Sequence, residues 1–283
     1  MRALLWSGAS GFLFVVLNTL MRQLAMDLTP FQTQFMRYVA GVLVMVPFML
    51  RSGFSAYRPN NILGHFVRGA VHTVGLVLWF VALPFITLAD TTAIGFTAPI
   101  FIMIGAALVF KEPMRWERWA ASAVGFGGVL LVVGPHMRGD GGIYTLLMLA
   151  SSPVFAASFL MTKALTRHER TEVIVVWQAV TVTLFSVPLA LLNWKAPSVW
   201  QLATFVVCGV LGSSGHYCLT RSFSTADISA SQSVKFLDLV WAAALGWMVF
   251  ADVPAQTTII GGVVIAASTV WIARREARGR APG

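Results

Sequence analysis

Three ionisable residues lie inside long apolar stretches of the sequence, where a charge is costly and points to function. Lys235 and Asp238 are three residues apart, so on a helix their side chains share one face and can pair with each other or hold a polar solute. Arg37 can bind a carboxylate or a phosphate through two parallel hydrogen bonds. The chemistry that these residue types favour is recognition of a polar solute rather than the making or breaking of bonds.

The face that carries Lys235 and Asp238 continues through Gln232 and Trp241. With a rise of about 1.5 Å per residue from Ser229, Asp238 lies about 13 Å along its segment, close to the middle of a bilayer. A polar stripe with one aromatic ring suits a cavity wall that stacks and hydrogen-bonds a planar solute. The alternative is that Lys235 and Asp238 only neutralise each other between packed helices. We favour a cavity or gating role, because an aliphatic pair would be less costly to insert.

Arg37 lies about 9 Å along its own segment, counted from Phe31. It can bind an anionic group, or its side chain can extend to the outer face beside Gln32 and Gln34, and the sequence leaves both open. Three more polar residues lie inside other apolar segments, where such residues more often pack helices than contact a ligand: Asn18, His72 and His216. We keep these three as candidates for solute contact.

Residue patterns typical of an enzyme or a metal site are missing from the sequence. The five histidines are scattered, and no cluster of His, Asp and Glu is expected at one membrane face. Cys208 and Cys218 are about 15 Å apart if they lie on one helix, so they cannot form a disulfide with each other. We therefore predict no catalytic residue, no cofactor and no metal.

These candidate residues must be held by a bundle of membrane-spanning helices. Of the 283 residues, 57% are hydrophobic and 11% are charged, whereas a soluble domain has about a quarter charged. Asp90 and Asp227 each precede an apolar segment, and we predict that they cap helices. No connecting loop exceeds about a dozen residues, so the sequence predicts an all-α integral membrane protein with no separate soluble domain. Ten segments are apolar over about 20 residues, enough to cross a bilayer: 3–22, 31–50, 64–83, 91–110, 117–134, 143–162, 173–193, 200–220, 229–250 and 256–273.

Basic residues are divided unevenly between the two sides of this bundle. Only Arg22, Arg138 and Lys195 lie on the outer side if the N-terminus is in the cytoplasm. The split follows the positive-inside rule, and it predicts an inner (plasma) membrane protein with both termini cytoplasmic. Anionic lipid then accounts for the net charge of +9, so we predict no nucleic-acid partner. Fifteen of the 20 basic residues lie at cytoplasmic ends: Arg2, Arg51, Arg58, Arg68, Lys111, Arg115, Arg118, Lys163, Arg167, Arg170, Arg221, Arg274, Arg275, Arg278 and Arg280.

The second half of the sequence repeats the first. Residues 88–93 resemble residues 225–230, and residues 110–113 have a counterpart in residues 250–254. Because each copy holds five segments and five is odd, the second copy must enter the membrane from the opposite face. Inverted repeats of this kind are typical of secondary transporters. The offset predicts two domains, residues 1–137 and 138–283.

Several of these stretches resemble a known family. Residues 80–101, with Glu112-Pro113 and the glycine-rich segment that follows, resemble an EamA-type domain of the drug/metabolite transporter superfamily. Residues 245–254 are similar to the same element in a partner domain. The resemblance implies ten helices in two inverted five-helix repeats. It also implies a carrier, not an enzyme, that moves a small organic metabolite as the repeats rock around a central cavity.

The stretch around residues 235–252 resembles riboflavin transporters and other vitamin carriers of this superfamily, so a vitamin such as riboflavin is an expected substrate. Export of amino acids or related metabolites is the alternative. An integral-membrane enzyme or a scaffold is less well supported, because the sequence has neither a catalytic cluster nor a soluble output domain. The expected partners are the small-molecule substrate and the lipid bilayer, and a homo-oligomer is left open.

Overall fold

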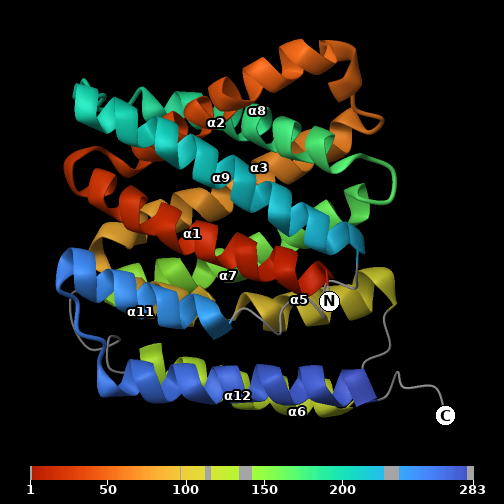
Figure 1. Cartoon of the computed structure of the whole chain (residues 1–283). Coiled ribbons are helices and arrows are strands. Elements are labelled where there is room, and N and C mark those ends of the chain that lie inside the picture. The colour runs from red at the N-terminus through yellow and green to blue at the C-terminus, as the bar shows by residue number, and fades with distance from the viewer. Residues whose placement is uncertain (1, 96, 112–115, 134–141, 226–235, 279–283) are drawn as a thin grey trace.

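Long helices that run side by side make up the computed structural model (Figure 1). The structure describes residues 2–95, 97–111, 116–133, 142–225 and 236–278, and within these ranges it is helical with no β-strand, which confirms the predicted all-α class there. Two short 3-10 turns, Phe54–Tyr57 and Leu83–Phe85, flank the third helix. The helices are α1 (Arg2–Asp27), α2 (Pro30–Ser52), α3 (Ile62–Ala82), α4 (Leu88–Gly95), α5 (Ala98–Phe110), α6 (Trp116–Val133), α7 (Gly142–Leu165), α8 (Thr171–Ala190), α9 (Val199–Thr225), α11 (Phe236–Phe250) and α12 (Gln256–Arg278).

Length and apolar composition make this chain a multi-pass membrane protein. Among the described residues, seven spans are long and apolar enough to cross a membrane: α1, α2, α3 with the turn after it, α4 together with α5, α7, α8 and α9. A shorter apolar run, Val240–Phe250, lies in α11. Large apolar side chains such as Leu108 and Val199 are exposed by 77% and 85%, as expected of a surface that lipid covers.

Helices from the two halves of the chain pack against each other throughout the bundle. α1 lies against α9 and α11, α2 against α8 and α9, and α3 against α7 and α8. α6 and α12 lie together along one edge (Figure 1). Where α2 meets α9, a Cβ added at Gly209 would lie 2.7 Å from the carbonyl carbon of Ala40, so only glycine allows this approach. The largest apolar core fills the space between α1, α2, α3, α8 and α9 with side chains that include Leu17, Met21, Tyr38, Leu76, Phe80, Val182 and Phe205.

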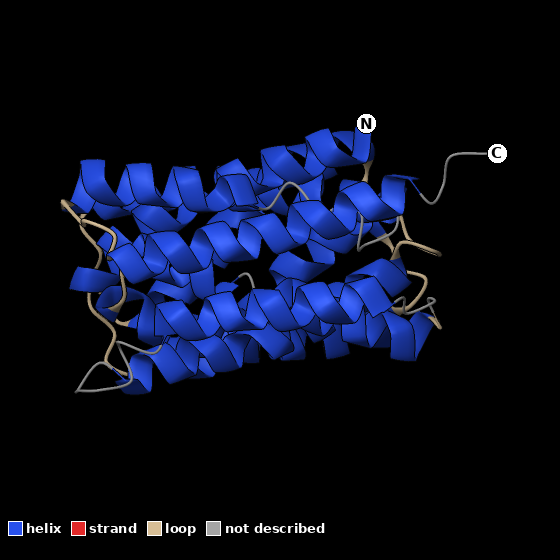
Figure 2. Ribbon diagram, turned by 90° about the horizontal axis from the view of Figure 1, so that it is seen from below, coloured by secondary structure: helices blue, strands red, loops and turns tan. Residues whose placement is uncertain are grey.

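Polar contacts join the two halves at both ends of the bundle. α1 begins and α12 ends at the same end, as Figures 1 and 2 both show. Near the other end of α1, Arg22 forms an ion pair with Asp252, and its guanidinium carbon lies 4.4 Å from the centre of the Phe250 ring. Before α3 begins, the backbone N–H groups of Asn60 and Asn61 donate to the Glu169 carboxylate at 2.6 and 2.9 Å.

The predicted segment 91–110 is two helices, and this corrects the sequence analysis. α4 ends at Gly95 and α5 begins at Ala98. Proline causes the break, because Pro99 has no N–H to donate to residue 95 and its ring would clash with that carbonyl. One carbonyl group at the break has a side-chain partner, because the hydroxyl of Thr97 donates a hydrogen bond to the carbonyl oxygen of Ile94 at 2.8 Å.

The prediction that Asp90 caps this helix is wrong in position. α4 already begins at Leu88, and the hydroxyl oxygen of Thr87 accepts the backbone N–H of Asp90 at 3.1 Å, so Thr87 is the capping residue. The Asp90 carboxylate instead accepts hydrogen bonds from the hydroxyls of Thr87 and of Thr258 on α12, at 2.8 and 2.5 Å. Its predicted counterpart Asp227 lies outside the described residues.

Candidate functional site

A cavity of about 210 Å³ lies between the two halves, and eight helices contribute to its wall: α1, α2, α3, α4, α5, α7, α9 and α11. Much of the wall is aromatic, with rings from Phe14, Tyr38, Trp79, Phe80, Phe155, Phe159 and Phe223. The break between α4 and α5 borders it through Gly95 and Ala98, and a Cβ added at Gly95 would meet nothing within 4 Å. The cavity therefore combines flat apolar surfaces with a few polar groups, which is the usual composition of a small-molecule site.

Five predicted site residues line this cavity together: Asn18, Arg37, His72, His216 and Asp238. They come from α1, α2, α3, α9 and α11, so residues up to 220 positions apart in sequence meet at one place. Gln232 and Lys235 lie outside the described residues.

Trp241 does not line the cavity, although the helical spacing places it on the same face as Asp238. Its side chain is 42% exposed and meets the ring of Phe12 edge-on, with the ring centres 5.4 Å apart. Of the α11 side chains that the structure describes, Asp238 in the first turn is the one that lines the cavity. Trp241, about one helical turn after Asp238, is therefore outside the cavity wall.

Asp238 lies against α1 at mid-depth. A Cβ added at Gly11 would lie 1.9 Å from the Oδ1 atom of Asp238, so the carboxylate fills the space that this glycine leaves. Gly11 lies about 14 Å along α1 from Arg2, and half of a hydrocarbon core is about 15 Å. The acid is thus held between the two halves of the chain, at the depth where ionisable groups most often serve function.

Arg37 faces the interior of the bundle. Its side chain lines the cavity, the residue is only 5% exposed, and its guanidinium carbon lies 4.0 Å from the centre of the Tyr38 ring. Gly212 on α9 makes room for it, because a Cβ there would lie 2.7 Å from Nη2. Among the residues that the structure describes, Arg37 makes no ion pair. The neighbouring Gln34 donates elsewhere, to the hydroxyl of Ser186 at 2.8 Å.

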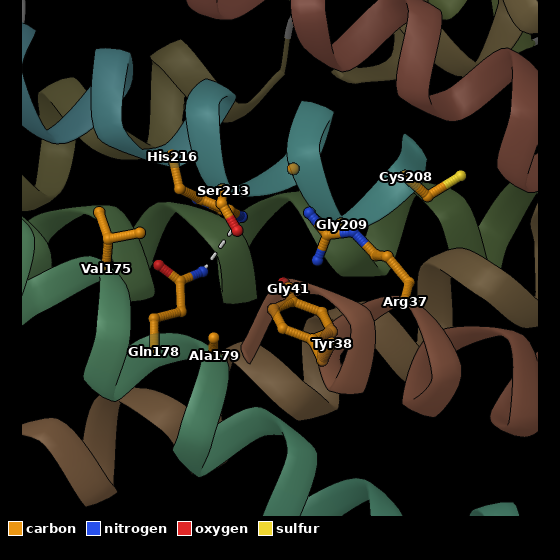
Figure 3. A pocket seen from close by; sticks show the side chains of 11 residues that line it. Arg37, Tyr38, Gly41, Val175, Gln178, Ala179, Cys208, Gly209, Ser213 and His216 are labelled. Atoms are coloured by element: carbon orange, nitrogen blue, oxygen red, sulfur yellow. Dashed lines mark hydrogen bonds between the residues drawn. The ribbon is translucent and has the colours of Figure 1, made fainter. Parts of the chain in front are cut away.

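A narrow crevice of about 10 Å³ opens beside the cavity between α2, α8 and α9 (Figure 3). Arg37 and Tyr38 on α2, Gln178 on α8 and His216 on α9 are among the residues that line it. The space is close to that of a single water molecule. Gln178, near the middle of α8, therefore lies beside Arg37, Tyr38 and His216, which also line the cavity.

The two cavity histidines belong to one buried hydrogen-bonded network. The amide nitrogen of Gln178 lies 3.0 Å from Nε2 of His72 and 3.2 Å from Nε2 of His216. The hydroxyl of Tyr38 lies 3.1 Å from the same His72 nitrogen, and Nδ1 of His72 lies 3.0 Å from the hydroxyl of Ser158. The rings of His72 and His216 meet edge-on, with their centres 5.6 Å apart.

Arg68 supports this network from the second turn of α3, near the end of the bundle that the sequence analysis predicts to be cytoplasmic. It is 2% exposed within α3, and its Nε donates to the hydroxyl of Thr162 on α7 at 2.6 Å. Nη1 donates to the carbonyl of Ile174 at 3.4 Å, and Nη2 donates to the amide oxygen of Gln178. These partners lie on α7 and α8, so the guanidinium is buried between α3, α7 and α8 and does not extend to the bundle surface.

Sequence reasoning missed Gln178, Arg68 and Tyr38. Gln178 could have been found, because it is a lone amide in the apolar run of α8 and such residues are costly in lipid. Arg68 could not, because only the packed structure tells an arginine that reaches the surface from one that turns into the bundle. In the described part of the chain, no three His, Cys, Asp or Glu side chains are grouped as a metal site.

Comparisons with known proteins agree with this architecture. The model of the EamA-like transporter family matches residues 1–134 and residues 142–274. A riboflavin transporter of Rhizobium johnstonii is 32% identical over 277 residues, which cover 97% of this chain and 91% of that protein. An S-adenosylmethionine uptake transporter of Rickettsia prowazekii is 27% identical over 255 residues, covering 90% of this chain and 86% of that one. A crystal structure with 18% identity superposes with a TM-score of 0.73 and covers 97% of this chain and 98% of its own, which is a likeness of fold.

Proposed function

This chain belongs to the EamA-like transporter family, and on that premise we propose that it carries a small organic metabolite with a planar aromatic part across the cytoplasmic membrane by alternating access. Family membership makes it a transporter and not an enzyme. Riboflavin is the first candidate substrate, because its ring system is planar and polar and a relative at 32% identity is a riboflavin transporter. Export of amino acids or related metabolites is the alternative drawn from the sequence.

The cavity between the two halves is the observation that carries this proposal. Its aromatic side chains offer ring faces on which a planar solute can stack, and edge-on or offset ring contacts are favourable by about 0.5 to 1.5 kcal/mol each. Arg37 on one wall and Asp238 on another supply charges of opposite sign. We propose that these two residues, with Asn18, His72 and His216, contact the solute.

Two inverted five-helix repeats, with the boundary near residue 137, would provide the moving parts. If α4 and α5 count as one broken span, the described residues place five helical elements in each half, with α11 as the counterpart of α5. Helix contacts support the repeat, if α1, α2, α3 and α5 of the first half match α7, α8, α9 and α11 of the second. Three contacts between the halves then have counterparts with the roles of the halves exchanged. The contact of α1 with α9 matches that of α7 with α3, α1 with α11 matches α7 with α5, and α2 with α9 matches α8 with α3. The family matches each half separately, which agrees with a repeat.

Orientation follows from the same arrangement. We infer that both termini are cytoplasmic, since α1 begins and α12 ends at one end of the bundle. Arg22 and Asp252 would then pair at the outer end. Basic residues concentrated at the other end agree with this orientation in an inner membrane.

Flux measurements in sealed vesicles test the proposal. Purified protein is reconstituted into proteoliposomes, and uptake and counterflow of labelled riboflavin are followed beside a panel of amino acids and nucleoside-like metabolites. We expect saturable movement of a planar aromatic solute, which fails in Arg37→Ala and persists in Gly127→Ala, whose Cβ would meet nothing within 4 Å. Movement of amino acids alone would favour the exporter alternative, and no flux of any solute would contradict the carrier.

A further inference from the structure

We propose that Arg68 and Gln178 are positioning residues that hold His72 and His216 as neutral imidazoles, each with its hydrogen on Nδ1. The role in solute binding rests on the proposed function, whereas the hydrogen-bond polarity follows from the contacts alone. Neither Arg68 nor Gln178 is among the side chains that line the main cavity. Their effect on the solute would be exerted through the histidines.

Arg68 sets the direction of the network because a guanidinium can only donate. Its Nε donates to the Thr162 hydroxyl at 2.6 Å, and that hydroxyl uses its own hydrogen on the carbonyl of Ser158 at 2.8 Å. Nη2 donates to Oε1 of Gln178. If the amide of Gln178 were turned over, two N–H groups would face each other, so the oxygen of Gln178 must point at Arg68.

The amide nitrogen of Gln178 must then point at the histidines. It carries two hydrogens and has two acceptors within reach, Nε2 of His72 at 3.0 Å and Nε2 of His216 at 3.2 Å. An imidazole nitrogen accepts only when it carries no hydrogen, so the hydrogen of each neutral ring lies on Nδ1. One amide group therefore sets the tautomer of two rings.

The remaining contacts of His72 agree with this assignment. Its Nδ1–H can donate to the hydroxyl oxygen of Ser158 at 3.0 Å. The hydroxyl of Tyr38, 3.1 Å from the unprotonated Nε2, can share the same lone pair with Gln178 in a three-centre hydrogen bond. Both nitrogens of this ring are engaged, so what His72 offers to the cavity is an uncharged ring face, beside the rings of Phe155 and His216.

Nearby charges act in the same direction. A cationic imidazole would place an N–H against the N–H of Gln178 and lose that hydrogen bond. Arg37 on α2 lines the cavity with both histidines, and Arg68 on α3 contacts Gln178, which contacts both rings. These two cations repel a further positive charge, while Asp238 on α11 is the acid in the described cavity wall. The network thereby keeps the two histidines neutral and leaves the charged contacts of a solute to Arg37 and Asp238.

Nitrogen NMR reads the proposed state directly. Protein labelled with ¹⁵N-histidine is placed in lipid bilayers at neutral pH, and the signals of His72 and His216 are assigned from His72→Asn and His216→Asn. An unprotonated ring nitrogen resonates well downfield of a protonated one. We expect Nε2 of both residues in the downfield position and Nδ1 in the protonated position. A hydrogen on Nε2 of either ring, or an imidazolium signal, in the unmodified protein overturns the proposal without recourse to any variant.

Gln178→Glu reverses the polarity of the network at nearly constant shape. A carboxylate still accepts from Arg68, but it has no hydrogen to donate, so both histidines must become donors at Nε2. We expect the downfield Nε2 signals to be lost in this variant and retained in Gln34→Glu, a matched control at a buried amide that contacts Ser186 instead. Unchanged histidine signals in folded Gln178→Glu would refute the role of Gln178. Because no transport is measured, the outcome stands apart from the fate of the carrier proposal.

Discussion

Replacing Gly11 with alanine would place a methyl group in the space that the Asp238 carboxylate occupies. The added Cβ would lie 1.9 Å from Oδ1 and 2.7 Å from Cγ, whereas Cβ atoms essentially never come within 3.0 Å of such a neighbour. The carboxylate or the helix that carries it must therefore move by more than about 1 Å. Asp238 has a short side chain, so this movement takes the carboxylate away from the position that it has in the cavity.

The energetic effect follows from the two ways of relieving this clash. Turning the Asp238 side chain off its rotamer costs about 0.5 to 1.5 kcal/mol, and spreading α1 from α11 as an overpacked core costs about 1 to 3 kcal/mol. Alanine recovers about 0.5 to 1 kcal/mol of helix propensity. We expect Gly11→Ala to lose about 1 kcal/mol of stability. Where a bound geometry matters, a 1 Å displacement can lower a rate on the order of 100-fold. We therefore expect the initial uptake rate to fall by more than the loss of folded protein alone would explain.

A double-mutant cycle separates the carboxylate from general packing. Thermal unfolding and initial uptake rates are measured for Gly11→Ala, Asp238→Ala and the double variant. With the carboxylate gone, the methyl group at position 11 has free space, so we expect its cost to vanish in the Asp238→Ala background, which corresponds to a coupling of about 1 kcal/mol. Gly127→Ala is the matched control, because its Cβ would meet nothing within 4 Å. If Gly11→Ala costs as much with alanine at position 238 as with aspartate, the carboxylate does not lie beside Gly11 and this reasoning is wrong.

Three further predictions concern the cavity and the helix contacts around it. Asp238→Asn or Lys235→Ala should abolish uptake while membrane insertion, followed by protease protection, stays intact; full transport in both variants would reduce the pair to a packing role. Gly209→Ala should lower the unfolding temperature, at a cost of about 1 to 3 kcal/mol, because its Cβ would lie 2.7 Å from the carbonyl carbon of Ala40; an unchanged temperature would contradict the close approach of α2 and α9. Arg37→Lys keeps the charge but loses the planar guanidinium over the ring of Tyr38, so we expect a higher KM for uptake at unchanged expression; an unchanged KM would exclude Arg37 from the contact.

Sequence alone could predict the all-α class and five of the residues that line the cavity, for a simple physical reason. In lipid, each isolated polar side chain is costly, so Arg37, His72 and Asp238 stand out against their apolar surroundings. If the proposed inverted repeat holds, their meeting point could be anticipated too, since a site is expected between inverted halves. The sequence pattern did not predict which part of a helical face borders the cavity. Trp241 shares a face with Asp238, but it lies one turn further along and contacts Phe12 instead of lining the cavity.

Elements that depend on tertiary contact could not be predicted in the same way. Asp90 looked like a cap because its segment was counted from residue 91, but Thr87 begins the helix and Asp90 contacts Thr258 on α12. Arg68 counted toward orientation because it lies near the start of its segment. Its true partners are about 100 residues away in sequence, and no local pattern points to them.

Burial of Arg68 also has a consequence for biosynthesis. Its hydrogen-bond acceptors, Thr162, Ile174 and Gln178, follow it by 94 to 110 residues. At a translation rate of about 5 to 20 residues per second, they emerge from the ribosome roughly 5 to 20 s after α3 does. During that interval the guanidinium must be solvated by lipid headgroups, by water or by the insertion machinery. α3 can therefore reach its final position only after α7 and α8 have been inserted. The two halves of this protein then fold as one unit rather than one after the other.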